Sequence, residues 1–366
     1  MHLKKEVNKN LLHQGGGKIF PVRSSQLLIL LIPFFVCGLW QQRNLLNFVS
    51  QNFLSGISSF QLNNDILSLS LKMFFILIPF LVVIAFELIF LYKESDFNIS
   101  GTTLGKLRST NYHDVWYTFL RLFFNKITLF LPFLTLGFTS INNKLGTLLE
   151  SFYTSFIPPE YSLFNSSLLV ISVLVLRDYT LYWSHRIYHQ NSILWDIHEF
   201  HHSATEMTVF NRNRLSLLED IIIMPFFAPI TVITSLIVSA YFSQGHILPL
   251  IIYMAYVGYL QFADTIAHSG IRIIYPKPIS YILMSPSLHW LHHSKNPNHY
   301  DCNFSVAFSF WDRIHGTYLS EEYLKDIDQY GVIGTTYNNY HPVYSFTILP
   351  ILKTTRNLTK LLSSSS

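Results

Sequence analysis

Histidines in three short clusters and one single position are the residues of this sequence best suited to chemistry. The sequence has 16 histidines, and nine of them combine spacings of three and four residues or stand at the end of an apolar run. Because residues three and four apart share one face of a helix, their imidazoles can reach the same ion. Burying so many unpaired imidazoles for packing alone costs free energy, so the pattern predicts metal ligation. The nine are His185, His189, His198, His201, His202, His268, His289, His292 and His293.

The number of histidines indicates two ions rather than one. A structural zinc site closes with four ligands, whereas nine nitrogens divided between two ions leave four or five for each. Imidazole suits iron, copper, zinc and nickel. So large a nitrogen shell favours a redox-active metal, and we predict two iron ions. Zinc has a higher intrinsic affinity for such ligands than iron and could replace it during purification.

Three carboxylates stand where they could support the histidines. Asp178 precedes His185 by seven residues, Asp264 precedes His268 by four, and Glu199 lies inside the second cluster. Ligating histidines usually donate their second ring N–H to a carboxylate or a carbonyl. We therefore predict that these three acids assist catalysis. The alternative for Asp178 and Asp264 is an acid at the membrane interface that lipid headgroups hydrate.

The composition indicates a chain that lipid largely solvates. Of the 366 residues, 50% are hydrophobic and only 13% are charged, whereas a soluble domain carries about 25% charged residues. The mean hydropathy is +0.30. The net charge of +4 is spread along the chain without a basic stripe, so nucleic acid is not a predicted partner.

Apolar runs predict an all-α, integral-membrane bundle of about four to six spans, with a cytoplasmic helical cap that holds the histidines. The first run could be a span or an interfacial helix, and it lacks the small-residue cleavage site of a signal peptide. The predicted runs are residues 25–40, 66–92, 115–138, 167–182, 221–241 and 247–267.

The distribution of lysine and arginine predicts which side carries the clusters. If the basic N-terminal tail is cytoplasmic, the positive-inside rule also places residues 183–220 and 268–366 on the cytoplasmic face. The chain then divides into a cytoplasmic tail (1–24), a membrane-spanning region without chemical motifs (25–165), a catalytic region (166–320) and a C-terminal tail (321–366). Residues 353–366 end in four serines and are predicted to fray.

Three stretches resemble a known family. They read DYTLYWSHRIYH, then LWDIHEFHHSATEM, then SPSLHWLHHSKNPNHYDCNFSVAFSFWDRIHGTY, and in this order they resemble the fatty acid hydroxylase superfamily, which includes sterol desaturases. The resemblance covers residues 170–320. Two positions depart from the family pattern: His315 stands where an aromatic residue is usual, and the stretch from Arg214 to Glu219 lacks a His-Pro pair. His315 and His299 are left outside the ligand set.

The resemblance implies a non-haem di-iron centre at the nine histidines, with O2 as co-substrate. It also implies an external electron donor, such as a cytochrome b5 or a ferredoxin. The implied reaction is hydroxylation or desaturation of a C–H bond in a lipid or sterol-like substrate drawn from the bilayer. No dinucleotide-binding fingerprint is present in the sequence, which agrees with reductant supplied from outside.

Other functions fit parts of the pattern. Within enzymes, an ether-lipid (alkylglycerol-type) monooxygenase and a carotenoid-type hydroxylase are the alternatives. In another class, a membrane metal transporter or storage protein could also collect histidines. Transporters place such residues along a path near the middle of the membrane, whereas these clusters are predicted to gather at one interface. That placement favours the enzyme.

Overall fold

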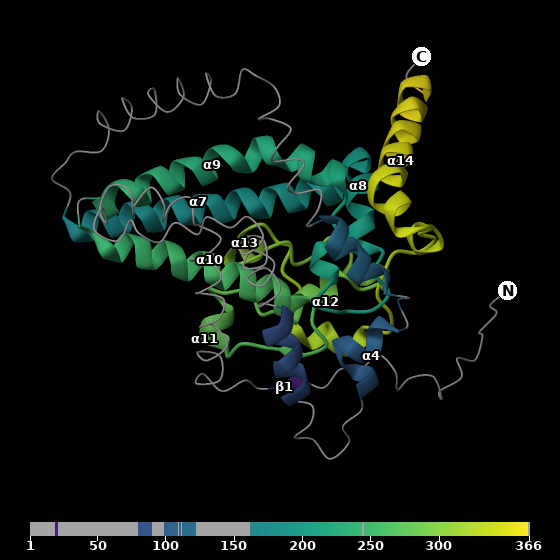
Figure 1. The fold of residues 1–366 in the computed structure, drawn as a ribbon, viewed down its shortest axis with the longest axis horizontal. Coiled ribbons are helices and arrows are strands. Elements are labelled where there is room, and N and C mark those ends of the chain that lie inside the picture. The colour runs from purple at the N-terminus through teal and green to yellow at the C-terminus, as the bar shows by residue number, and fades with distance from the viewer. Residues whose placement is uncertain are drawn as a thin grey trace, which may run out of the picture.

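The computed structural model describes residues 19–20, 80–89, 99–108, 110, 112–121, 162–243 and 245–364, and most of them are helical (Figure 1). The predicted helical fold class is confirmed for this part of the chain. Its one pair of strands, β1 (Ile19–Phe20) and β2 (Arg272–Ile273), is parallel and two residues long. The long helices are α7 (Leu163–Gln190), α8 (Ser192–His202), α9 (Leu217–Ser243), α10 (Ile247–Ala267) and α14 (Pro342–Ser364).

Shorter helices connect and brace these five. The α-helices are Phe80–Ile89, α4 (Thr103–Leu107), one over 113–121, α11 (Lys277–Ser280), α12 (Leu288–His292) and α13 (Phe310–Ile314). The 3-10 helices are η2 (Ile99–Gly101), η3 (Asn211–Asn213), η4 (Pro297–His299), η5 (Glu321–Asp326) and η6 (Tyr337–Asn339).

Helices α7, α9 and α10 lie side by side and form the bundle (Figure 1). Its core joins Val170 and Leu174 of α7 to Val238 of α9 and to Tyr253 and Val257 of α10. All five side chains are buried, so removal of apolar surface from solvent holds the three helices together. The bundle therefore gives α7 and α10 fixed positions relative to each other. His185 and His189 lie near the C-terminal end of α7, and His268 caps the C-terminal end of α10.

Two helices, α7 and α10, are long and apolar enough to cross a membrane. Helix α10 has the predicted bounds of 247–267, and α9 contains the predicted run 221–241. Helix α7 is longer than the predicted run 167–182 and continues to Gln190, so His185 and His189 belong to the same helix as that run. The runs 25–40, 66–92 and 115–138 lie wholly or mostly outside the described residues. The number of spans and the cytoplasmic face stay predictions.

A single residue turns the chain between two histidine-bearing helices. Asn191 ends α7 in an extended conformation (φ −106°, ψ 120°), and its side-chain oxygen accepts hydrogen bonds from the N–H groups of Ile193 and Leu194 at 3.0 and 3.1 Å. This is the N-cap geometry that starts a new helix. Because one residue separates α7 from α8, the two helices pack against each other.

The residues after α10 fold into a cap of short helices and loops on the bundle's histidine-bearing end. Its core contains Met207, Leu288, Trp290, Leu324 and Tyr330, which join the loop after α8 to α12, η5 and the segment that follows η5. This packing fixes α12, which is only five residues long. A helix that short is not stable alone, so tertiary contacts must hold its histidines.

A buried acid ties an N-terminal helix to the loop after α10. Glu87 accepts hydrogen bonds from the N–H and hydroxyl groups of Thr103, at 2.7 and 2.9 Å, and from the N–H of Gly270 at 2.6 Å. A Cβ atom at Gly270 would lie 2.7 Å from the carbonyl oxygen of Gly101, so only glycine fits there. These contacts hold the chain two residues after His268.

The C-terminal residues differ from the prediction of a frayed tail. Helix α14 continues to Ser364. Near its start, Phe346 and Leu349 join a buried cluster with aromatic residues of α8 and η6. Further along, the Lys353 ammonium group lies 2.8 Å from both carboxylate oxygens of Glu199 in α8. Apolar burial and this ion pair fix the first half of α14 on the cap, which the serine-rich end did not indicate.

Candidate metal centre

The nine predicted histidines lie together in two groups of ring nitrogens. Within each group, one nitrogen from every residue lies within 4.8 Å of all the others. The five-histidine group consists of His185, His189, His198, His202 and His292. The four-histidine group consists of His201, His268, His289 and His293. The two groups are adjacent, because the rings of His202 and His293 stack with their centroids 4.4 Å apart.

Each His-His dipeptide contributes one residue to each group. On α8, His202 belongs to the five-histidine group and His201 to the four-histidine group; at α12, His292 and His293 divide in the same way. Consecutive residues point about 100° apart around a helix of 3.6 residues per turn, so neighbouring imidazoles cannot easily share one ion. The repeated His-xx-His-His motif therefore suits two adjacent ions.

The spacing of the nitrogens fits a shared ion. In the four-histidine group the Nε2 atom of His289 lies 3.0 Å from that of His293 and 3.1 Å from that of His268. In the five-histidine group the Nε2 atoms of His198 and His202 lie 3.2 Å apart. Nitrogens bound at about 2.0–2.1 Å from one ion, at octahedral or tetrahedral angles, are separated by about 2.9–3.4 Å. The donor atoms are thus already at ligand spacing.

Hydrogen bonds to the second ring nitrogen orient several of the imidazoles. An Nδ1–H that donates to an oxygen leaves the lone pair on Nε2, which is the arrangement found in most metal-bound histidines. Four histidines follow this pattern. His185 donates to the carbonyl of Phe304 (2.8 Å), His292 to that of Cys302 (2.8 Å), His268 to that of Asp264 (2.7 Å) and His198 to the Glu219 carboxylate (2.8 Å).

Burial favours the neutral form of several site imidazoles. It lowers the pKa of His198 to about 3, and it holds other pKa values well below the usual range, because a charged ring loses its hydration. Neutral rings have the lone pair that a metal needs. Among the described residues, the buried Nε2 atoms of His189 and His292 have no hydrogen-bond partner, which is costly unless an ion occupies that place. Burial also lowers the pKa values of His201, His202, His289, His292 and His293.

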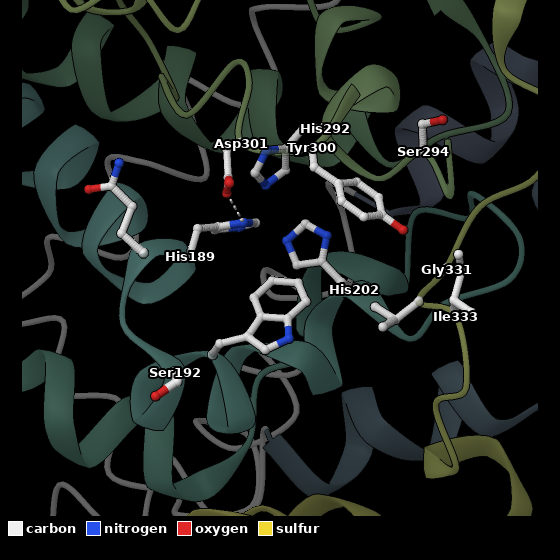
Figure 2. A pocket seen from close by; sticks show the side chains of 12 residues that line it. His189, Ser192, His202, His292, Ser294, Tyr300, Asp301, Gly331 and Ile333 are labelled. Carbon is white, nitrogen blue, oxygen red and sulfur yellow. Dashed lines mark ion pairs between the residues drawn. The ribbon is translucent and has the colours of Figure 1, made fainter. Parts of the chain in front are cut away.

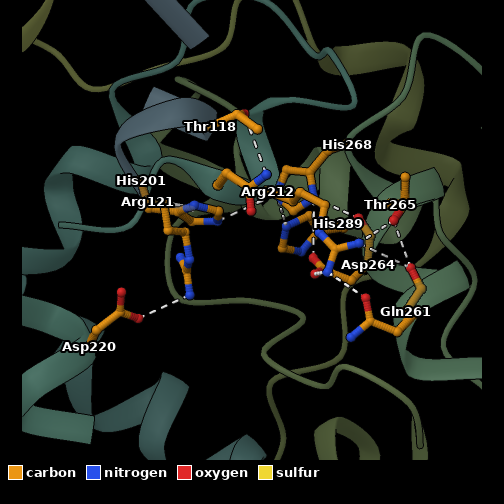
Figure 3. A network of polar contacts seen from close by, with 11 residues as sticks. Thr118, Arg121, His201, Arg212, Asp220, Gln261, Asp264, Thr265, His268 and His289 are labelled. Atoms are coloured by element: carbon orange, nitrogen blue, oxygen red, sulfur yellow. Dashed lines mark hydrogen bonds and ion pairs between the residues drawn. The ribbon is translucent and has the colours of Figure 1, made fainter. Parts of the chain in front are cut away.

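One of the three predicted acids lies beside a histidine of the site. The Asp264 carboxylate lies 3.4 Å from Nδ1 of His268, and Arg212 holds its other oxygen at 3.0 Å (Figure 3). Arg212 is itself fixed by Gln261, whose side-chain oxygen accepts a hydrogen bond at 2.9 Å. A chain of charged and polar groups therefore sets the orientation of the only histidine that α10 brings to the site.

The other two acids lie elsewhere. Asp178 accepts hydrogen bonds from the hydroxyl of Tyr256 at 3.2 Å and from the indole N–H of Trp311 at 3.1 Å, so it links α7 to α10 and α13. Glu199 points toward α14, where it pairs with Lys353. Neither makes the expected hydrogen bond to a site histidine, and their catalytic roles stay predictions.

Sequence reasoning did not assign a role to two acids that do lie at the site. Glu219 accepts from His198, as described above, and a carboxylate oxygen of Asp301 lies 3.7 Å from Nδ1 of His189. Glu219 had a usable signal, since it stands at the start of an apolar helix just as Asp264 stands near the end of one. The carbonyls that accept from His185 and His292 leave no trace in the sequence, because every residue has one.

The two histidines left outside the ligand set lie outside both groups. The Nδ1 atom of His299 lies 2.9 Å from the hydroxyl of Ser294. The ring of His315 stacks on Tyr182, with centroids 5.1 Å apart. His315 thus occupies an aromatic environment, which explains how it can replace an aromatic residue there.

A cavity of about 540 Å³ opens against the five-histidine group (Figure 2). His189, His202 and His292 form its inner wall, and the labelled Tyr300 and Asp301 stand beside them (Figure 2). Volumes of about 300–1,000 Å³ are usual for sites that bind small molecules. The remaining lining comes from the α7–α8 region, the residue after the α12 histidines and the loop at 331–333: Gln190, Ser192, Trp195, Ser294, Gly331, Val332 and Ile333.

Comparison with known proteins identifies this region. Residues 170–317 match the family model described as fatty acid hydroxylase. This span holds both histidine groups and ends within the third of the stretches that resemble the family. This part of the chain is similar to the fatty acid hydroxylase family, as its three histidine stretches predicted.

Several curated relatives match the same region. Alkylglycerol monooxygenase of Xenopus tropicalis is 28% identical over 169 residues, which are 46% of this chain and 32% of that protein. Ornithine lipid hydroxylase OlsE of Rhizobium tropici is 24% identical over 172 residues, 46% of each chain. Very-long-chain aldehyde decarbonylase GL1-4 of Oryza sativa subsp. indica is 22% identical over 147 residues, 38% of this chain and 22% of that protein.

These matches are partial. The chain spans about a third of the length of the alkylglycerol monooxygenases it matches. No solved structure matches the chain.

Proposed function

We propose that this chain is a multi-pass membrane oxygenase with a non-haem di-iron centre, which uses O2 to hydroxylate or desaturate a C–H bond of a lipid. One observation carries the proposal: nine buried or half-buried histidines form two adjacent groups whose nitrogens stand at ligand spacing. The match of residues 170–317 to the fatty acid hydroxylase family supports the lipid substrate. When bound, the two irons would supply activation of O2, which no side chain provides.

The protein's own residues would hold and orient the ions. Helices α7, α8 and α12 would supply the five-histidine group, while α8, α12 and the end of α10 would supply the four-histidine group. Glu219 and Asp264 would keep His198 and His268 in the tautomer that leaves Nε2 free. Burial of the rings excludes water from around the reacting atoms, which limits side reactions.

The cavity beside the five-histidine group is the proposed place for the reacting part of the lipid. Trp195 and Ile333 offer apolar surface there, while Asp301 and Ser192 are polar. A lipid segment with one polar group would match this mixed lining. An ether lipid is the leading alternative to a fatty acyl chain or sterol, because alkylglycerol monooxygenases are among the curated relatives.

An electron-transfer protein, such as a cytochrome b5 or a ferredoxin, is the proposed source of reductant. The histidine groups lie at the C-terminal ends of α7 and α10, so the centre would stand at one face of the membrane. We propose that this is the cytoplasmic face, where such donors are available.

The metal content of the purified protein tests the proposal. We would express the wild type with added iron, extract it in mild detergent, and measure iron and zinc per chain. We expect close to two irons for the wild type and a sharp loss for His202→Ala. The control is His246→Ala, because His246 precedes α10 at the end opposite to His268 and bonds Ser166 rather than either group.

Two results would reject the di-iron proposal. One is iron content that stays the same in His202→Ala, and the other is a single zinc in all three proteins. A transporter or storage protein would instead bind metal and change cellular metal uptake when its gene is deleted. Unchanged uptake together with an altered lipid profile would favour the oxygenase.

A further inference from the structure

Helix α14 presents an apolar stripe away from the protein. Ile348, Ile351, Leu352 and Leu358 have exposed fractions of 47%, 48%, 50% and 43%. Intervals of three, four and ten residues place their side chains within about 120° of one another around a helix of 3.6 residues per turn. The buried residues Phe346 and Leu349 lie on the opposite side, where α14 packs on the cap.

The charge of α14 is entirely positive. Between Pro342 and Ser364 the sequence contains Lys353, Arg356 and Lys360 and no aspartate or glutamate. Lys353 and Lys360 lie on the side of the helix away from the apolar stripe, and Arg356 lies at its edge, four residues after Leu352. A helix with one apolar face and a basic opposite face suits the boundary between lipid tails and anionic headgroups.

The orientation of α14 matches that location. Helix α14 stands across the ends of α7 and α9 rather than along them (Figure 1). It packs on α8 and on α9, at the end of the bundle that carries the histidines. If α7 and α10 cross the membrane, a helix crosswise to them at this end lies near the membrane plane.

Two other arrangements fit less well. A membrane-crossing α14 would carry three basic side chains within eight residues into the hydrocarbon, which is costly, and Lys353 already pairs with Glu199 on the cap. Pairing with α14 of a second copy would bring together two helices that have only positive charges. Anionic lipid offers both the apolar surface and the opposite charge.

We infer that α14 is an in-plane helix that rests on the bilayer, with Ile348, Ile351, Leu352 and Leu358 in the acyl boundary and Arg356 and Lys360 at anionic headgroups. This inference uses the proposed membrane crossing of α7 and α10 but does not depend on the metal or the reaction. Because Lys353 is paired with Glu199, the helix would also fix α8 relative to the membrane.

Spin-label accessibility in nanodiscs tests the inference on the full chain. Cys37 and Cys302 are replaced by alanine, and single cysteines are placed at Ile351, Leu358, Arg356 or Lys360 for labelling. The nanodiscs contain either phosphatidylcholine alone or an equal mixture of phosphatidylcholine and phosphatidylglycerol. Collisions with O2, which concentrates in lipid, are compared with collisions with a water-soluble nickel complex.

We expect labels at 351 and 358 to collide mainly with O2 and labels at 356 and 360 mainly with nickel. The contrast should grow in the anionic nanodiscs. Replacing Arg356 and Lys360 by glutamine, with the label at 358, should reduce the lipid-immersed population relative to the exposed one by about fivefold per charge. The loss should occur only in the anionic nanodiscs.

Three results would overturn the inference. Equal nickel collisions at all four positions would describe a helix in water. Low collisions with both reagents at 351 and 358 would describe a protein contact, such as a second copy. If the labels are immersed equally in the two kinds of nanodisc, anionic headgroups do not contribute to the binding of α14. Iron content, measured on the same samples, reports separately on the di-iron proposal.

Discussion

Two neighbouring acids at the start of α9 offer a sharp test of how the protein supports its metal centre. Glu219 accepts a hydrogen bond from His198 at 2.8 Å, whereas Asp220 pairs with Arg121 at 2.9 Å. They are adjacent in sequence and lie in the same first turn of the helix. Replacing either residue by alanine therefore has a similar effect on the first turn of α9, but the two substitutions remove contacts to different partners.

We expect Glu219→Ala to weaken iron binding and Asp220→Ala to leave it nearly unchanged. Loss of a group that orients a metal-bound histidine typically costs about 10–100-fold in metal affinity, which is about 1.4–2.7 kcal/mol. Glu219 is buried, so no water is available to replace it at His198. The Arg121–Asp220 pair is partly exposed, and such pairs contribute about 0–1 kcal/mol. Glu219→Gln keeps an oxygen that can accept the hydrogen bond and should lie between the other two.

The assay is a chelator titration of the iron-loaded protein in detergent, with the iron that remains bound measured at each chelator concentration. The midpoint for Glu219→Ala should fall by one to two orders of magnitude relative to the wild type. Equal losses of iron affinity in Glu219→Ala and Asp220→Ala would mean that iron binding depends on the packing of α9 and not on the hydrogen bond from His198 to Glu219. A wild-type midpoint in Glu219→Ala would show that His198 needs no support from this acid.

Three further predictions concern stability, each measured by thermal unfolding in detergent. Arg214→Met leaves the buried carboxylate of Asp114 without its 2.7 Å partner and should lower the free energy of unfolding by about 3–5 kcal/mol. Adding Asp114→Leu should restore most of this stability. If the double variant shows no recovery, the buried unpaired charge is not the cause of the loss. Gly331 has φ +108°, and Gly331→Ala puts a Cβ atom 3.3 Å from the carbonyl oxygen of Ala204. Gly334 also has a positive φ, +76°, but a Cβ atom there meets open space. Gly331→Ala should therefore lower the unfolding midpoint more than Gly334→Ala, and equal effects would exclude a steric contribution at Gly331. Removing iron with a chelator should lower the midpoint of the wild type but not that of a variant that binds no iron.

The sequence predicts the components of the site well because their signals are local. Spacings of three and four residues identified the histidines that α7, α8 and α12 bring together, and the apolar run 247–267 has the bounds of α10. These features depend on helix geometry, which is the same wherever the helix lies.

The partners of the histidines were harder to predict because they come from distant parts of the chain. His185 bonds the carbonyl of Phe304, which is 119 residues away, and any residue type could provide that oxygen. Asp178 is seven residues from His185, yet its carboxylate turns to Tyr256 and Trp311. Helical spacing predicted the face of α7 on which Asp178 lies. It did not predict which neighbouring helix packs against that face.

The same long-range contacts explain why the centre depends on the whole cap. Helix α12 has five residues and carries histidines of both groups, so it cannot form its site by local propensity. It is held by the buried packing of Leu288 and Trp290 and by the hydrogen bond from His292 to Cys302. Ions bound between α12 and the long helices would join these elements further, so metal binding and folding of the cap should be coupled. On this reasoning, a cap variant that contacts no histidine can still lose iron, and iron content should follow cap stability as well as ligand identity.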